Sequence, residues 1–323
     1  MITVTILALD NVLASSVMGS MDVLCQTGFT WNFIAGEDEV SYFDVKIVTK
    51  DGKPAKSRNQ AAIYPNCSIR DILSTDLIII SSFSDYNTLG TSDEAIEWLR
   101  IHNNKGATIA SVCAGTFILA ETGLLNGKTA TTHWGLANDF RERYPDIKLQ
   151  PEKIITDEGN LLCSGGCTSY IDLSVYLVER FCGKDIALES SKAILHDIGR
   201  NSQEPYAVYQ FAKDHNDSKI RLIQKWLEEN YDQNVDIKDL AENFGLSRRV
   251  FERRFKAATG NTPLLYLQRS RVEMAKNLLE KSFKTFSEIA FMVGYEDTSF
   301  FRKLFKKHTN LLPKEYRAKF CRE

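Results

Sequence analysis

Residues 240–266 read LAENFGLSRRVFERRFKAATGNTPLLY, and residues 289–316 repeat the pattern as IAFMVGYEDTSFFRKLFKKHTNLLPKEY. The offset is 49 residues at the turn glycines (294 − 245) and 50 at the later phenylalanines (305 − 255), so the second copy has one extra residue in its turn. Self-similarity at this period indicates one supersecondary unit used twice. Each copy predicts a short helix, a glycine turn and a second helix with aromatic residues four apart on its buried side.

The second helix of each copy carries side chains suited to a DNA groove. Phe251 and Phe255 are predicted to face inward, with Ser247 as N-cap of the first such helix and Asp297 or Thr298 as N-cap of the second. The side chains left for DNA are Arg248, Arg249, Glu252, Arg253 and Lys256 in the first copy, and Thr298, Ser299, Arg302, Lys303 and Lys306 in the second. Guanidinium groups suit guanine, carboxylates suit the cytosine amino group, and ammonium groups suit phosphates. A solvated basic face is the alternative for one charged helix, but the doubled pattern favours a pair of groove-reading helices.

Charge is divided along the chain. Residues 217–323 contain 22 Lys and Arg against 15 Asp and Glu, whereas residues 1–216 contain 18 against 27. The formal net charge of −2 therefore hides a basic C-terminal module on an acidic body. A basic module attracts phosphates while the acidic body does not, which predicts double-stranded DNA, an operator, as a partner.

The second copy also carries a family resemblance. Its residues Ile289, Val293-Gly-Tyr, Ser299-Phe-Phe-Arg, Phe305-Lys, Pro313 and Tyr316-Arg317 match the AraC/XylS signature, and the resemblance extends back to about residue 218. It implies a seven-helix domain with two helix-turn-helix units joined by a long helix, here over residues 263–279. Asn310 stands where the family pattern has glycine. Because Asn is the next-best residue at a left-handed C-cap, we expect the geometry to be kept.

Length and composition predict two domains in the 323 residues: 1–200 and 218–323, with a polar linker over 201–217. The N-terminal residues have no basic segment and no long apolar span, so neither a signal peptide nor a membrane contact is expected. A bacterial cytoplasmic protein is predicted. The seven cysteines, an odd number, argue against a disulfide framework. Cys163 and Cys167 lack nearby histidines, so neither a metal site nor a cofactor is expected.

The first two hundred residues alternate between strand and helix patterns. Short β-branched apolar runs at 2–9, 44–49, 77–81 and 108–112 predict strands buried on both faces. Helices are predicted at 93–103, 114–122 and 170–181, and a hairpin at 153–163 with its turn at 157–160. The pattern predicts an α/β doubly wound, flavodoxin-like parallel sheet domain, followed by the all-α domain with two helix-turn-helix units.

The chemical question in this domain is Cys113. The residues TIASVCAGTF place it where an apolar strand ends and turns into a helix, the layout of a nucleophile elbow. The thiol is predicted at the carboxyl edge of the sheet near a helix N-terminus, which can lower its pKa. His133 follows twenty residues later (133 − 113). Cys113 as a small residue in a tight turn, and His133 as a packed side chain, remain open.

Both segments resemble the DJ-1/PfpI superfamily, with its Cys-Ala-Gly elbow and Thr-Thr-His at this separation. The longer runs 112–134 and 166–180 are similar to GlxA-type regulators, which fuse such a domain to an AraC-type reader. This resemblance implies a ligand-responsive transcription factor that forms a homodimer through its N-terminal domain. The predicted effector pocket holds Cys113, His133 and Asp172, although Asp172 can equally serve only the first turn of its helix. Binding there is expected to alter operator affinity or contact with RNA polymerase.

Two alternatives stay open. One is a cysteine enzyme, hydrolase or glyoxalase-like, and the other is a thiol redox sensor, each with a DNA-binding tail. Enzymes of the superfamily place a glutamate from the first strand–helix region against the cysteine. Here that neighbourhood offers Ser15 and Ser16, with Asp22 the only acid close by. Without a positioned acid or base the thiol lacks the partner that nucleophilic catalysis needs, so no enzymatic activity is predicted.

Overall fold

The computed structural model describes residues 1–84, 93–209, 211, 213 and 215–321. The chain divides into two compact units, residues 1–203 and 204–323, which are described separately. Within the described residues, no helix has the length and apolar character needed to cross a membrane.

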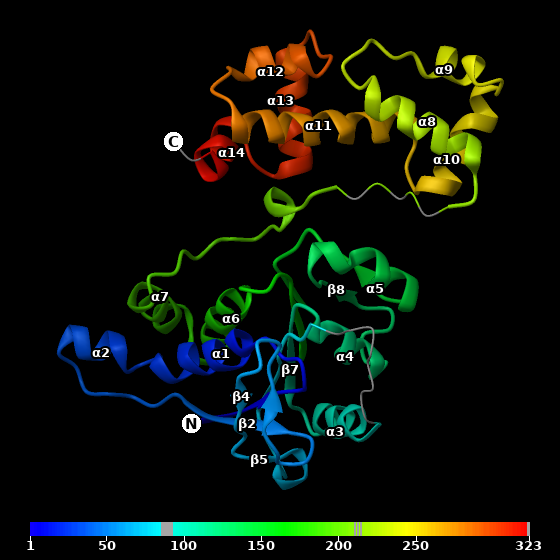
Figure 1. Ribbon diagram of the computed structural model, residues 1–323. Helices are drawn as coiled ribbons and strands as arrows, with labels where there is room; N and C mark the ends of the chain where they lie inside the picture. Colours follow the sequence, from blue (N-terminus) through cyan, green and yellow to red (C-terminus); the bar gives the residue numbers. More distant parts are fainter. Residues whose placement is uncertain (85–92, 210, 212, 214, 322–323) are drawn as a thin grey trace. The chain divides into compact units, whose positions relative to one another are not determined.

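The first unit is built on a seven-stranded sheet with strand order β10-β11-β7-β6-β1-β2-β5 (Figure 1). The strands are β1 (Ile2–Leu7), β2 (Phe43–Thr49), β5 (Cys67–Ser68), β6 (Leu77–Ile80), β7 (Thr108–Val112), β10 (Ile155–Asp157) and β11 (Leu161–Ser164). All pairs are parallel except β10 with β11, which forms the predicted hairpin. Two short ribbons, β3 (Ala55–Lys56) with β4 (Ala62–Ile63) and β8 (Thr129–Ala130) with β9 (Lys148–Leu149), lie outside this sheet. The doubly wound parallel sheet is thereby confirmed.

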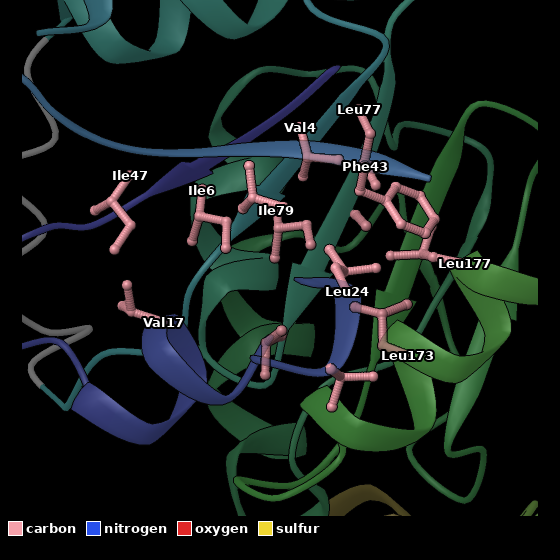
Figure 2. Packing of buried hydrophobic residues seen from close by; sticks show 14 of the residues in the cluster. Val4, Ile6, Val17, Leu24, Phe43, Ile47, Leu77, Ile79, Leu173 and Leu177 are labelled. Atoms are coloured by element: carbon pink, nitrogen blue, oxygen red, sulfur yellow. The ribbon is translucent and has the colours of Figure 1, made fainter. Parts of the chain in front are cut away.

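Helices cover both faces of the sheet, so its strands are buried on both sides as predicted. The helices are α1 (Ala14–Gln26), α2 (Thr30–Ala35), α3 (Asp93–Asn104), α4 (Gly115–Glu121), α5 (Ala137–Arg143), α6 (Tyr170–Cys182) and α7 (Lys184–Ala193). Alternate strand residues point to opposite faces. Ile79 packs in the core shared with α1 and α6, which Figure 2 shows with Leu24 and Leu173. Its neighbour Ile80 packs in the second core, with Phe117 of α4.

Seven helices make up the described part of the second unit, apart from a short 3-10 turn at Glu204–Tyr206. They are α8 (Ser218–Glu229), α9 (Ile237–Asn243), α10 (Arg248–Thr259), α11 (Pro263–Lys281), α12 (Phe286–Met292), α13 (Thr298–Thr309) and α14 (Pro313–Phe320). The helix α11 joins two separate cores: Tyr266 near its start packs with α8 to α10, and Leu279 near its end packs with α12 to α14. The sequence predicted this long helix, which continues to Lys281.

Part of the segment predicted as a linker, residues 201–217, packs against one unit or the other. Ser202 forms an isolated bridge with Lys153, and Gln203 is only 2% exposed, so both belong to the first unit. Phe211 packs its ring on Tyr266 in the second unit, with ring centroids 4.4 Å apart. Residues 210, 212 and 214 of the predicted linker lie outside the described residues.

Candidate functional site

Cys113 occupies a strained elbow at the carboxyl edge of the sheet, where the strand–turn–helix pattern predicted it. Its φ is 54°, in the left-handed region that costs an L-residue about 1–2 kcal/mol. Two hydrogen bonds hold this conformation: the Cys113 N–H donates to the Ser164 carbonyl at 2.7 Å, and the Thr132 hydroxyl donates to the Cys113 carbonyl at 2.8 Å. The elbow therefore depends on two segments distant in the sequence, and Thr132 is the residue of the Thr-Thr-His motif that touches it.

The glycine of the Cys-Ala-Gly motif is needed for close packing under the elbow. A Cβ atom at Gly115 would lie 2.7 Å from the Ile80 carbonyl oxygen at the end of β6, well inside van der Waals contact. Any side chain there would push α4 away from the sheet. The glycine thus lets the start of α4 lie against the end of β6.

The charge state of the elbow thiol differs from the sequence prediction. A hydrogen bond with the Cys167 thiol and burial raise the pKa of Cys113 well above its usual value. The same hydrogen bond, reinforced by the positive charge of Arg58, lowers the pKa of Cys167. The backbone N–H of Ala114 at the start of α4 does lower the pKa of Cys113, but the Cys167 thiol and burial raise it by more, so the net direction is upward.

Ser16, one of the two serines that the sequence offers near the elbow, bonds to the backbone, and the hydroxyl that acts on the Cys113 thiol is that of Ser82. Ser16 on α1 is fully buried, donates to the Leu13 carbonyl at 2.8 Å and accepts the Ser82 N–H at 3.0 Å. Asp22 is exposed, and its charge acts on Cys25 further along α1. No carboxylate is among the groups that set the pKa of Cys113 in the described residues.

His133 lies just after Thr132, at the start of a 3-10 turn (Trp134–Leu136). Its Nδ1 accepts the Gly135 N–H at 3.0 Å, and its ring lies 5.2 Å from that of Trp134. Burial lowers the pKa of His133, so the ring is neutral at pH 7. A neutral, half-buried imidazole can contact a ligand through a hydrogen bond.

Asp172 on α6 is held in an ion-pair cluster. Both its carboxylate oxygens accept from the Arg200 guanidinium, and His196 Nε2 lies 3.4 Å from its Oδ1. The Asp172 side chain is 6% exposed. Its carboxylate thus holds the segment that follows α7. The sequence suggested as an alternative that Asp172 serves only the first turn of α6, and these ion pairs are an additional role.

Gln203, the last residue of the first unit, forms side-chain hydrogen bonds with the loop beside the elbow. Its amide nitrogen lies 2.8 Å from the Thr132 carbonyl and 2.9 Å from the carbonyls of Pro151 and Lys153. Its amide oxygen accepts the Trp134 N–H at 3.2 Å. The sequence placed Gln203 in a polar linker, and no local pattern marks it. We name these contacts the Gln203 latch.

In the second unit, the two turns of the repeat have matching hydrogen bonds. The N–H of Gly245 donates to Glu242 O at 2.9 Å, and the N–H of Gly294 donates to Phe291 O at 3.0 Å. The residue after each glycine donates to the carbonyl five positions earlier, at 2.9 Å in both copies. Asn310 has φ 54°, as predicted for a left-handed C-cap, at the position of Gly260 in the first copy. One turn geometry is therefore built twice.

The buried faces of the repeat also match. Phe251, Phe255, Phe301 and Phe305 are fully buried, as predicted. Tyr266 donates its hydroxyl to Glu228, and Tyr316 donates its hydroxyl to Glu280, each at 2.6 Å. The N-caps differ: Asp297 accepts from two N–H groups of α13, whereas Ser247 makes no side-chain cap bond to α10.

Most of the predicted DNA-contact residues are on the solvent side of α10 and α13. The exposed ones are Arg248, Arg249, Arg253, Lys256, Ser299, Arg302, Lys303 and Lys306, and the half-buried ones are Glu252 and Thr298. Glu252 pairs with Arg248 at 2.9 Å within the helix. Arg254, by contrast, forms a two-point ion pair with Asp217 before α8, so it braces the fold.

Comparison with known proteins agrees with both units. The DJ-1/PfpI family model matches residues 3–180, and a helix-turn-helix domain model matches residues 240–319. The chain belongs to the DJ-1/PfpI family. Its second unit adds an AraC-type helix-turn-helix domain to that DJ-1/PfpI domain. In the described residues, no cluster of three or more His, Cys, Asp and Glu side chains could hold a metal ion.

Relatives that match most of this chain are named as regulators, and one that matches about half of it is named as an enzyme. The chain is 25% identical over 276 residues to the HTH-type transcriptional regulator CdhR of Pseudomonas aeruginosa, covering 84% of this chain and 81% of that regulator. It is 29% identical over 176 residues to the isonitrile hydratase of Pseudomonas putida, covering 52% of this chain and 75% of that enzyme. The crystal structure of DJ-1beta from Drosophila melanogaster shares the DJ-1/PfpI fold, with a TM-score of 0.52 and 20% identity over 60% of this chain and 98% of that one.

Proposed function

We infer that this chain is a DNA-binding transcriptional regulator whose N-terminal domain senses a small molecule. The observation that carries the inference is the doubled turn geometry, which gives two helices, α10 and α13, each with arginines and lysines exposed and aromatics buried. A single basic helix is commonly a solvated surface. Two copies of the same exposed chemistry, joined by one long helix, are suited to read two successive stretches of a major groove.

The roles of the exposed residues follow from their partners. Arg249 and Arg253 are assigned to base edges, and Lys256 to phosphate. Glu252 holds Arg248 through its ion pair, so this pair acts as one unit that either reads cytosine or orients the arginine. On α13 the corresponding set is Ser299, Arg302, Lys303, Lys306 and the half-buried Thr298.

Salt dependence of DNA binding tests this function. The full chain is titrated with a duplex oligonucleotide at a series of salt concentrations, using fluorescence anisotropy. Binding is expected at low ionic strength, with log affinity falling by about 0.9 per phosphate contact for each tenfold rise in salt. Lys256→Ala is expected to reduce that slope by about 1, and Lys225→Ala, an exposed residue of α8 that pairs with Glu229, to leave it unchanged. Absence of binding at low salt would refute the function.

The proposed effector site is the elbow, with Cys113, Cys167 and His133 around it. Effector binding is coupled to DNA affinity through the Gln203 latch, because Thr132 touches both Cys113 and Gln203. A ligand that moves the Thr132 loop must also strain the segment that leads to Glu204. Coupling of this kind needs only that the ligand prefer one arrangement of the latch. A thermal-shift screen of metabolites against the full chain finds the effector, and the change in DNA affinity that it causes in the full chain and in Gln203→Met tests the coupling.

Regulation without catalysis is the function we favour over a cysteine enzyme. The isonitrile hydratase relative keeps the enzyme alternative open. The elbow thiol is protonated at neutral pH because Cys167 takes the charge and burial disfavours a thiolate, whereas a nucleophilic cysteine needs a lowered pKa or an adjacent base. Turnover of an isonitrile or a dicarbonyl compound that is lost in Cys113→Ser would overturn this choice.

A homodimer and a contact with RNA polymerase complete the proposal. Sedimentation of the full chain tests the dimer. Transcription in vitro from a bound operator tests the polymerase contact and shows whether the output is activation or repression.

A further inference from the structure

Two cysteines from different strands meet at the elbow. Cys113 follows β7, and Cys167 lies three residues past Ser164, the last residue of β11. The strands are parallel neighbours with Val112 opposite Ser164, and the Cys113 N–H bonds to the Ser164 carbonyl at 2.7 Å. This pairing brings the loop that carries Cys167 beside the elbow, where each of the two thiols shifts the pKa of the other. Both are free thiols.

The two thiols differ in access and in charge. Cys167 is exposed, whereas Cys113 is 3% exposed. The Cys113 thiol lowers the pKa of Cys167, and the positive charge of Arg58 lowers it further. The more reactive sulfur is therefore that of Cys167, which solvent can reach, whereas the Cys113 sulfur is buried.

We propose that Cys113 and Cys167 form a reversible dithiol–disulfide pair that hydroperoxides oxidise, with Cys167 as the attacking sulfur and Cys113 as the resolving one. This modification site concerns the thiols alone and does not rest on the proposed DNA-binding function. It also departs from the simple sensor considered from the sequence, in which Cys113 itself reacts first.

The chemistry balances in two steps. The Cys167 thiolate attacks the peroxide oxygen, the O–O bond breaks, and Cys167 becomes a sulfenic acid while an alkoxide or hydroxide leaves and takes up a proton. The Cys113 sulfur then attacks the Cys167 sulfur, its proton joins the departing hydroxide as water, and the S–S bond forms. Two electrons pass from the thiol pair to the peroxide. A small dithiol reductant reverses the reaction.

Disulfide formation would draw on the freedom of the loop that carries Cys167. An S–S bond of about 2.0 Å places the two Cβ atoms about 3.5–4.5 Å apart. Cys113 is fixed by its two hydrogen bonds, so Cys167 must move. It follows Gly165 and Gly166 in a loop that ends at Ser169, where the Ser169 hydroxyl bonds to the Gly166 carbonyl. A loop with two glycines is the segment best able to adjust.

Peptide mapping tests the pair. The full chain is treated with equimolar hydrogen peroxide, blocked with a maleimide, digested without reduction and analysed by mass spectrometry. The expected product is a peptide that links Cys113 to Cys167 and is lost on treatment with dithiothreitol. Cys25 is the internal control, since it is also exposed but its pKa is raised by burial and by Asp22. Cys167 should react at least about tenfold faster than Cys25.

Variants separate the two roles. Cys113→Ser is expected to leave a Cys167 sulfenic acid that dimedone traps, and Cys167→Ser to leave Cys113 reduced under the same treatment. If Cys113→Ser does not fold, the linked peptide in the unmodified protein remains decisive. A Cys113 sulfinic acid without the linked peptide would overturn the proposal, and so would oxidation of Cys25 ahead of Cys167. DNA binding is not measured, so these outcomes are independent of the proposed function.

Discussion

Replacing Gln203 with methionine should destabilise the first unit by an amount that its contacts define. The amide nitrogen has four acceptors within 3.3 Å, and the amide oxygen has one donor, the Trp134 N–H. An NH2 group has only two protons, so at most three of these five contacts are full hydrogen bonds at one time. At about 1 kcal/mol for each, Gln203→Met should lower the free energy of unfolding by about 3 kcal/mol.

Methionine has nearly the same length as glutamine, so Gln203→Met removes the hydrogen bonds without leaving a cavity. Gln203→Ala adds the cavity and should cost about 1 kcal/mol more. Gln26→Ala is the matched control, because Gln26 is exposed on α1 and should change stability by less than about 0.5 kcal/mol.

Urea unfolding of the full chain, followed by tryptophan fluorescence, measures these changes. Three of the four tryptophans, Trp31, Trp98 and Trp134, lie in the first unit, so the signal reports mainly on it. Hydrogen exchange at the Trp134 amide should also become faster in Gln203→Met. If that variant unfolds within about 0.5 kcal/mol of the unmodified protein, the latch contributes no net stability and the free energies assigned to its hydrogen bonds are wrong.

Three further predictions follow from the remaining contacts. Arg249→Ala and Arg253→Ala should each weaken binding at particular base pairs by about 1 to 3 kcal/mol, measured with duplexes that differ at single positions; an equal loss on every sequence would make these arginines phosphate contacts. Tyr266→Phe and Tyr316→Phe should each lower the unfolding free energy by about 1.5 to 3 kcal/mol, since each removes one hydrogen bond to a carboxylate; the Tyr266 hydroxyl also accepts from the Gln224 amide at 3.3 Å, so a clearly smaller loss at Tyr266 than at Tyr316 would contradict this assignment. Alkylation of Cys167 by iodoacetamide should rise with pH through about 6 and then level off, because the hydrogen bond from Cys113 and the charge of Arg58 lower the pKa of Cys167 to about 6 and the thiolate forms above that value. In Cys113→Ala the midpoint should move up toward that of a free thiol, and an unchanged midpoint would show that Cys113 does not set it.

The fold could be predicted from the sequence wherever it depends on periodic patterns or on residues close together in the chain. The repeat at Gly245 and Gly294 predicted both turns, because identical spacing of buried aromatics leaves few other structures. The elbow was predicted for a similar reason, since an apolar run that ends in Cys-Ala-Gly gives a strand followed directly by a helix. Asn310 also adopts the left-handed C-cap conformation that was predicted for it.

Features that depend on distant segments were not accessible. The pKa of Cys113 depends on Cys167, which strand pairing brings to the elbow from beyond β11, and no pattern around residue 113 reveals it. Gln203 lay in a stretch rich in polar residues, which is typical of a linker, and only the tertiary structure shows its four carbonyl and hydroxyl partners. Asp172 shows the same limit, because Arg200 and His196 approach it from beyond the next helix.

Selection of duplexes from a random pool tests most directly that α10 and α13 read DNA together. The full chain is incubated with a pool of double-stranded oligonucleotides at low salt, and the bound fraction is amplified and sequenced over several rounds. We expect one motif with two blocks of fixed bases about one helical turn apart, the first block lost in Arg249→Ala with Arg253→Ala and the second in Arg302→Ala. No enriched motif, or a motif that survives both sets of changes, would contradict the assignment of these two helices as the reading elements.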